Sequence, residues 1–160
     1  MGGVGVHLLL SRDHYYCFKL GVGLSTNTRS EFLALWTLLH CAKNMGLPLL
    51  HIHGDYAVII NWFNQRSALT LLTLDGWCHY IRELEPHFIQ LTAIHIEREH
   101  NTTADSLSKE ALTLALGQLQ FTEFTNGECI DQGSFLLFWP TALDLLCYSY
   151  LLHPLDDGCG

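Results

Sequence analysis

Three acidic residues stand where predicted helices begin. Glu31 lies in the stretch T-R-S-E, Asp55 directly follows the run L-L-H-I-H-G, and Asp105 lies in the stretch T-T-A-D. Carboxylates that converge without basic partners repel one another and take up protons. Divalent cations such as Mg²⁺ prefer oxygen ligands and remove that repulsion, and a pair of them can clamp both sides of an attack on a phosphate. Together, the three acids are candidates for a metal site that acts on phosphate esters.

Helix capping is the competing explanation for each acid. Thr28 and Glu31 form a capping box, Asp55 is a good N-cap, and Thr102 with Asp105 forms a weaker capping box. Capping is common, so any one acid taken alone fits it better than catalysis. Their combined setting favours a site, because Asp55 ends a strand, and α/β folds place their sites at the carboxyl ends of strands.

A different metal site could be built on His51, His53 and Asp55. Alternate residues of a strand project to one face, as metal ligands would have to. Such sites usually carry a histidine directly after the aspartate, where this chain has Tyr56. Imidazole-based sites need a fuller ligand set, so this metallohydrolase is the weaker hypothesis.

The elements that must position these residues follow from the hydrophobic periodicity, which predicts a mixed α/β domain of order β-β-α-β-α-α-β-α. Trp36, Trp62 and Trp77 fall on apolar helix faces and are predicted to lie in the core. The predicted strands cover 2–10, 14–20, 49–53 and 91–97, and the predicted helices cover about 28–45, 56–63, 74–84 and 102–116.

The domain organisation follows from a change in the pattern of apolar and polar residues after Gly117. We expect one domain over residues 1–116, an edge strand and loop of the same domain over 117–139, and a divergent tail over 140–160. Residues 134–152 are apolar, but Pro140 and Asp144 interrupt them, so an added helix or a tail is favoured over a membrane span.

The charge balance argues against tight, non-specific nucleic-acid binding. Sixteen acidic residues face eight basic ones, for a net charge of −8, whereas phosphate contacts normally require a basic surface. A local basic strip or metal-mediated contact remains compatible with this balance. Arg98 and Lys109 could touch phosphate, although an ion-paired role is the default.

The cysteines and the start of the chain point to an intracellular protein, nuclear or cytoplasmic. None of the six cysteines forms a C-x-x-C pair, and the start M-G-G-V lacks the basic region of a secretory signal. We therefore expect mostly buried, reduced thiols.

Three segments carry a family resemblance. They are T-N-T-R-S-E-F-L-A-L-W (26–36), H-G-D-Y-A-V-I-I-N-W (53–62) and H-I-E-R-E-H-N-T-T-A-D-S-L-S-K-E-A-L (95–112). In this order and at about this spacing they resemble the plant, reverse-transcriptase-associated branch of the ribonuclease H family. The resemblance runs from Gly2 to about Leu116 and continues more weakly through 118–138.

The resemblance implies a role for each matching residue. Glu31, Asp55 and Asp105 match the family's catalytic metal ligands, and Asn27 matches an asparagine that reads the RNA strand through its 2′-hydroxyls. The implied activity is cleavage of the RNA strand of RNA–DNA hybrids with Mg²⁺, or Mn²⁺, in a two-metal site. The implied protein is a monomer without a small-molecule cofactor.

Some family members carry a mobile histidine before the last aspartate, which helps product release. His100 is the nearest match by position in the loop, and His95 is the second. We favour the simpler interpretation of both as surface or strand histidines.

The resemblance also implies a missing part. The family's first strand ends in Asp-Gly, lies in the centre of the sheet and supplies a bridging metal ligand, and this sequence starts after it. Asp13 lies in a predicted hairpin turn and cannot replace that aspartate. We therefore expect an incomplete two-metal site, and unpaired backbone groups that cost roughly 1–3 kcal/mol each.

Two functional hypotheses follow from this gap. The first is a truncated reading of a longer enzyme, a hybrid-directed endoribonuclease active only if an upstream segment supplies the first strand. The alternative is a decayed, transposon-derived remnant that is catalytically inactive and has only a binding or structural role.

Overall fold

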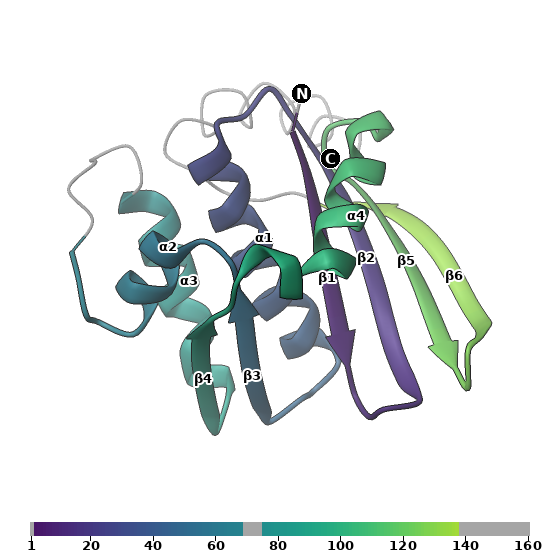
Figure 1. Cartoon of the computed structure of the whole chain (residues 1–160), viewed down its shortest axis with the longest axis horizontal. Helices are drawn as coiled ribbons and strands as arrows, with labels where there is room; N and C mark the ends of the chain where they lie inside the picture. Colours follow the sequence, from purple (N-terminus) through teal and green to yellow (C-terminus); the bar gives the residue numbers. More distant parts are fainter. Residues whose placement is uncertain (1, 69–74, 138–160) are drawn as a thin grey trace, which may run out of the picture.

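The computed structural model describes residues 2–68 and 75–137 (Figure 1). Short 3₁₀ turns lie at Glu85–His87 (η2), Arg98–His100 (η3) and Ala111–Thr113 (η4). The main elements are β1 (Gly2–Leu9), β2 (His14–Gly23), α1 (Asn27–Asn44), β3 (Leu49–Gly54), α2 (Ala57–Phe63), α3 (Asp75–Leu84), β4 (Gln90–His95), α4 (Thr102–Glu110), β5 (Gln118–Thr125) and β6 (Glu128–Leu136).

The predicted element order and the mixed α/β class are confirmed. Two details differ from the prediction. Helix α4 ends at Glu110 rather than at residue 116, because the chain tightens into η4 and then turns at Gly117, which has a φ of 81°. The predicted edge strand is the first half of a hairpin, since Asn126 and Gly127 both adopt positive φ and return the chain as β6. Residues 140–160 of the predicted tail lie outside the described residues.

The strands form two separate sheets. The larger sheet is antiparallel, in the order β1-β2-β5-β6, and the smaller one is the parallel pair β3-β4. Figure 1 shows β1 and β3 as neighbouring strands that run in opposite directions. Within the described ranges no strand pairs with the second edge of either β1 or β3. The described strands therefore form two sheets with a break between β1 and β3.

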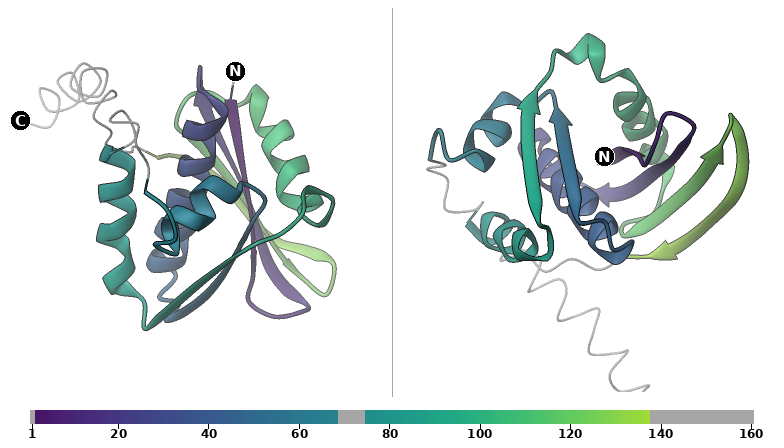
Figure 2. Two further views of the ribbon diagram at one scale, coloured as in Figure 1. Left: turned by 60° about the vertical axis from the view of Figure 1, so that its left-hand side comes forward. Right: turned by 90° about the horizontal axis from the view of Figure 1, so that it is seen from below.

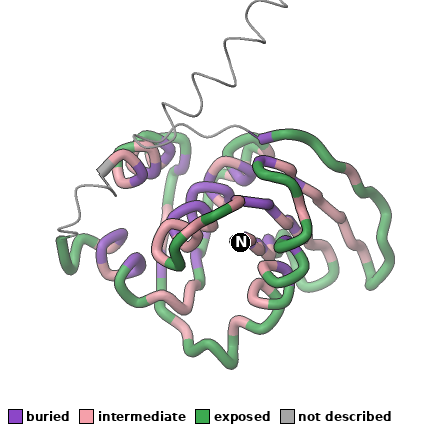
Figure 3. The backbone as a smooth tube through the Cα atoms, turned by 90° about the horizontal axis from the view of Figure 1, so that it is seen from above, coloured by how far each residue is buried: buried purple, intermediate pink, exposed green. Residues whose placement is uncertain are grey.

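Helix α1 joins the two halves and carries much of the core (Figures 2 and 3). It contacts both β1 and α3. Phe32 is fully buried and meets the ring of Trp62 in α2 at 5.5 Å, while Trp36 meets Trp77 of α3 at 6.4 Å. The three tryptophans are buried, as predicted. No helix in the described part of the chain is long and apolar enough to cross a bilayer.

Glycines in β1 allow α4 to lie unusually close to the sheet. A Cβ on Gly5 would lie 2.2 Å from the carbonyl oxygen of Ala104, and a Cβ on Gly3 would lie 2.3 Å from that of Ser108. Real side chains do not tolerate such distances, so only glycine fits at these two positions. The G-G-V-G start of the chain is thus the reason that α4, and with it Asp105, approaches the other acids.

Candidate functional site

The three predicted acids line one small pocket. Glu31 comes from the second turn of α1, Asp55 follows the carboxyl end of β3, and Asp105 lies in the first turn of α4. The pocket has a volume of about 60 Å³, and Gly3 and Gly5 form part of its wall. The structure therefore brings together three side chains that are 24 and 50 residues apart along the chain.

Glu31 is the most perturbed acid of the three. Burial raises the pKa of its carboxyl group to about 7, and the charges of Asp55 and Asp105 add to this increase, while Arg98 opposes it. In the described part of the chain no group donates a hydrogen bond to this carboxylate. Glu31 is therefore a partly buried acid without a hydrogen-bond partner among the described residues, which is a common feature of functional sites.

Each of the other two acids has a basic neighbour. Lys109 Nζ lies 2.9 Å from Asp105 Oδ2, one helical turn further along α4. Arg98 Nε lies 4.0 Å from Asp55 Oδ2 and is largely exposed to solvent. Arg98 and Lys109 therefore have the ion-paired roles that the sequence analysis gave as the default. Exposed pairs of this kind are weak and easily rearranged when a stronger ligand arrives.

The capping explanation of the three acids is wrong. Thr26 caps α1, accepting a hydrogen bond from the backbone N–H of Arg29 at 3.2 Å. Helix α2 has Tyr56 as its N-cap and α4 has Asn101, and neither makes a side-chain capping bond. Because none of the acids is used in a cap, their convergence on one pocket needs another reason.

Sequence reasoning missed the contact that fixes α1 relative to the end of β3. The hydroxyl groups of Thr28 and Tyr56 form a hydrogen bond of 2.8 Å. Thr28 lies one turn before Glu31, and Tyr56 directly follows Asp55. This bond therefore holds the two segments that carry the first two acids. Nothing in the local sequence signals it, since the two residues are 28 positions apart.

The remaining predicted residues do not line this pocket. Asn27 is the exposed first residue of α1 and does not line the pocket. His95 Nε2 donates a hydrogen bond to the carbonyl oxygen of Asp55 at 3.2 Å, and His100 is exposed in η3. His51 and His53 are exposed on β3, and His51 contacts Thr92 of β4.

The three carboxylates suit a hard cation, but they lie too far apart to coordinate one together. Three carboxylates without bound protons are the chemistry that Mg²⁺ and Mn²⁺ select. Among the described residues, however, no three His, Cys, Asp or Glu side chains are close enough to hold a metal ion together. The same result applies to His51, His53 and Asp55. The pocket is therefore a set of suitable donors that must draw together to bind a cation.

Several solved structures of ribonucleases H have a similar fold. The chain is similar to RNase H1 from Halobacterium salinarum (21% identity, TM-score 0.57, covering 71% of this chain and 97% of that one). It is also similar to the N-terminal RNase H domain of a Mycobacterium tuberculosis protein (17%, 0.58, 69% and 91%). A third similar structure is LC11-RNase H1 in complex with an RNA/DNA hybrid (19%, 0.55, 69% and 93%).

Sequence comparison assigns the family. No curated protein matches the chain. The model of the family described as reverse transcriptase-like matches residues 1–111, a span that includes all three acids of the pocket. The chain belongs to the reverse transcriptase-like family and has the ribonuclease H fold.

Proposed function

We propose that this chain is a ribonuclease H-like nucleic-acid-binding domain whose family activity is metal-dependent cleavage of the RNA strand of RNA–DNA hybrids. The observation that supports it best is the convergence of Glu31, Asp55 and Asp105 on one pocket, in a chain of the reverse transcriptase-like family. The complex of LC11-RNase H1 with an RNA/DNA hybrid supports the substrate class.

A divalent cation would be held by Glu31, Asp55 and Asp105, with Mg²⁺ first and Mn²⁺ second. When bound, it supplies an activated water and stabilises the charge on the phosphate. The residues of the chain have their own tasks. Asp55 must turn away from Arg98, and Asp105 from Lys109, before either can act as a ligand. Glu31 must lose the proton that its raised pKa retains.

The substrate-reading role belongs to Asn27, at the exposed start of α1. Its side-chain amide can both donate and accept a hydrogen bond, which suits a 2′-hydroxyl group. We expect Asn27→Ala to weaken binding of an RNA–DNA hybrid by about 5–10-fold, the loss of one net hydrogen bond. Binding of a DNA duplex of the same sequence should not change. Equal weakening for both duplexes would assign Asn27 to phosphate contact instead.

The second candidate function is binding without catalysis. It is favoured by the pocket itself, in which two of three acids have basic neighbours and no closed ligand set exists in the described chain. It is also favoured by the acidic net charge of −8. On this alternative the chain is a remnant that has only a binding or structural role.

Hybrid cleavage distinguishes the two candidates. The purified 160-residue chain is incubated with a labelled RNA–DNA hybrid in Mg²⁺ and, separately, in Mn²⁺, while binding is followed by fluorescence anisotropy. Cleavage that Asp55→Asn abolishes and Asp131→Asn retains would establish the enzyme, since Asp131 is exposed on β6, away from the pocket. Binding without cleavage would establish the inactive domain. Loss of both would overturn the proposed function.

The remaining parts of the proposal concern the branch of the family, the oligomeric state and the cellular compartment. We place the chain in the plant, retrotransposon-derived branch of the family, as an intracellular monomer of the nucleus or cytoplasm. The quoted sequence segments support the branch, and buried Cys41 is consistent with a reducing compartment. Light scattering and localisation of a tagged full chain would test the oligomeric state and the compartment.

A further inference from the structure

Lys109 occupies one of the three acids of the pocket while no divalent cation is bound. Its Nζ lies 2.9 Å from Oδ2 of Asp105, four residues earlier on α4. The Lys109 side chain is 73% exposed and that of Asp105 is 28% exposed. A largely exposed ammonium group is thus held on a carboxylate of the candidate site, and it can leave that carboxylate without disturbing the core.

Helix stability is the ordinary explanation of this ion pair. A carboxylate followed by a lysine four residues later modestly stabilises an α-helix. Lys109 is also the basic residue of the last turn of α4, where a positive charge favours the helix dipole. Both effects are available to any acid at this spacing. Asp105, however, lines the pocket, so the same bond also covers one of the proposed cation ligands.

Lys109 and a divalent cation must exclude each other from Asp105. Both need the same carboxylate oxygens, and a hard divalent cation is the stronger ligand for them. Exposed Lys–Asp pairs contribute little, so Lys109 is readily displaced. In the described part of the chain, no other carboxylate forms an ion pair with Lys109. Displacement therefore leaves a free ammonium group at the rim of the pocket.

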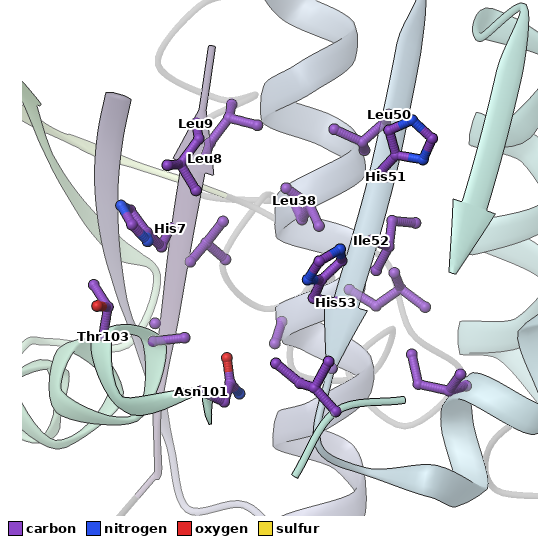
Figure 4. Close-up of a pocket in the computed structure, with 18 of the residues that line it drawn as sticks. His7, Leu8, Leu9, Leu38, Leu50, His51, Ile52, His53, Asn101 and Thr103 are labelled. Carbon is purple, nitrogen blue, oxygen red and sulfur yellow. The ribbon is translucent and has the colours of Figure 1, made fainter. Parts of the chain in front are cut away.

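Few other cations near the pocket can contact a phosphate. The acid pocket adjoins a larger pocket of about 560 Å³ on the side of β1 and β3, and Gly5, Glu31 and Asn101 line both. Figure 4 shows the start of α4, with Asn101 and Thr103, on the β1 side of this larger pocket. Among the described residues, no Lys or Arg side chain lines it. Basic contacts to the acids come instead from Arg98 of η3 and Lys109 of α4.

Lys109 is better suited to a phosphate than Arg98. Arg98 stands between Glu97 and Glu99, and all three side chains are exposed. Two neighbouring carboxylates oppose the approach of a phosphate group to this guanidinium. The contact of Arg98 with Asp55 is also the longer of the two ion pairs, at 4.0 Å. A nucleic-acid strand that reaches the pocket carries its phosphates to the rim where Lys109 lies.

We propose that Lys109 alternates between two anions. It binds Asp105 when the site is free of a divalent cation, and it binds a phosphate group of the nucleic-acid strand when a cation occupies the site. The inference rests on the proposed function and adds to it a coupling between cation and substrate. A chain with a net charge of −8 would thereby gain a phosphate contact only when the site is ready for cleavage.

Cation binding is measured first, without nucleic acid. The full 160-residue chain is titrated with Mn²⁺ and followed by electron paramagnetic resonance. Lys109→Gln removes the competitor for Asp105, so we expect Mn²⁺ to bind about 2–5-fold more tightly. Lys109→Arg retains a competing cation and should bind Mn²⁺ as the unmodified chain does. Lys43→Gln is the control for the loss of one positive charge, because Lys43 is exposed in the last turn of α1, and it should change nothing.

Binding of a labelled RNA–DNA hybrid is measured next, in Mg²⁺ and separately in EDTA. Stopped-flow anisotropy extrapolated to zero time gives the affinity before any cleavage. In Mg²⁺, Lys109→Gln should weaken binding about 5–10-fold at roughly 100 mM salt and reduce the salt slope by about 0.9, the value of one phosphate contact. In EDTA its slope should equal that of the unmodified chain, because Asp105 then holds Lys109. Lys109→Arg and Lys43→Gln should keep the unmodified slope in both solutions.

The opposite signs of the two effects carry the test. A purely structural Lys109 would not tighten Mn²⁺ binding while weakening hybrid binding. Mn²⁺ affinity that Lys109→Gln leaves unchanged or lowers would overturn the inference. A slope that Lys109→Gln reduces equally in Mg²⁺ and EDTA would also overturn it, since Lys109 would then be a permanent phosphate contact. These outcomes leave the proposed function intact, whereas absence of hybrid binding in both solutions would overturn that function together with the inference.

Discussion

The ionisation of Glu31 should control the pH dependence of stability. Its pKa is raised from 4.5 to about 7 in the folded chain, so the folded state binds the proton more tightly than the unfolded state between these values. Stability must therefore fall as the pH rises through this window and stay lower above it. Glu31→Gln should remove the slope and raise stability at pH 8 by on the order of 1–3 kcal/mol, allowing for solvent screening.

Urea unfolding at pH 5 and pH 8, in the presence of a chelator, measures this effect. Glu97→Gln is the control, because it removes an exposed carboxylate that lies outside the pocket. Added Mg²⁺ should recover part of the lost stability at pH 8 in the unmodified chain but not in Glu31→Gln. An equal pH dependence in all three proteins would show that the ionisation of Glu31 does not control the pH dependence of stability.

At this scale the sequence predicts which acids lie close together better than it predicts their contacts. Glu31, Asp55 and Asp105 were found from their types, spacing and family resemblance, and they line one pocket. The competing capping assignment failed because it depends on where each helix starts, which is uncertain by one or two residues. The bond between Thr28 and Tyr56 could not be predicted, because it depends on how α1 and the start of α2 meet in space.

At the scale of elements, the packing of α4 on β1 should depend on Gly5. In Gly5→Ala the new methyl group would lie 2.2 Å from a backbone oxygen and 2.5 Å from a backbone nitrogen of α4, neither of which can rotate away. Helix α4 must then shift and carry Asp105 with it. We expect a loss of about 1–3 kcal/mol in the free energy of unfolding and weaker Mg²⁺ binding.

Gly54→Ala is the matched control for this substitution. Gly54 also lies in a strand, but an added methyl group would meet only side-chain atoms, Cδ1 of Ile60 at 3.1 Å and its Cγ1 at 3.5 Å. Its stability should change by less than about 0.5 kcal/mol. Calorimetry and Mg²⁺ titration of both variants give the comparison. Equal losses in the two would mean that the close approach of α4 is not what requires glycine at position 5.

At the scale of the whole molecule, the order of the helices and strands was predictable. The division of the strands into two sheets was only partly predictable. Periodicity identified the elements, since each has a buried face that the sequence displays. Periodicity could not predict the break between β1 and β3, because pairing between strands that are separated by 39 residues leaves no local mark in the sequence. Only the family resemblance gave a reason to expect it. What the sequence did not indicate is that α1 packs against both β1 and α3 and so joins the two sides of the molecule.

This role of α1 predicts that the two halves unfold together. Phe32 is fully buried and contacts Trp62, while the helix that carries it packs against β1. Phe32→Ala should therefore destabilise both halves, by about 3–5 kcal/mol. In a chain that also carries Trp139→Phe, tryptophan fluorescence follows one half, since the remaining Trp36, Trp62 and Trp77 all lie in α1–α3. Amide exchange in β2 and β5 follows the other half. Both signals should shift by the same amount, whereas Phe121→Ala, at a partly exposed position on β5, should shift them less. If exchange in β2 and β5 stays slow while the fluorescence transition moves, the larger sheet is stable without α1 and the two halves are independent folding units.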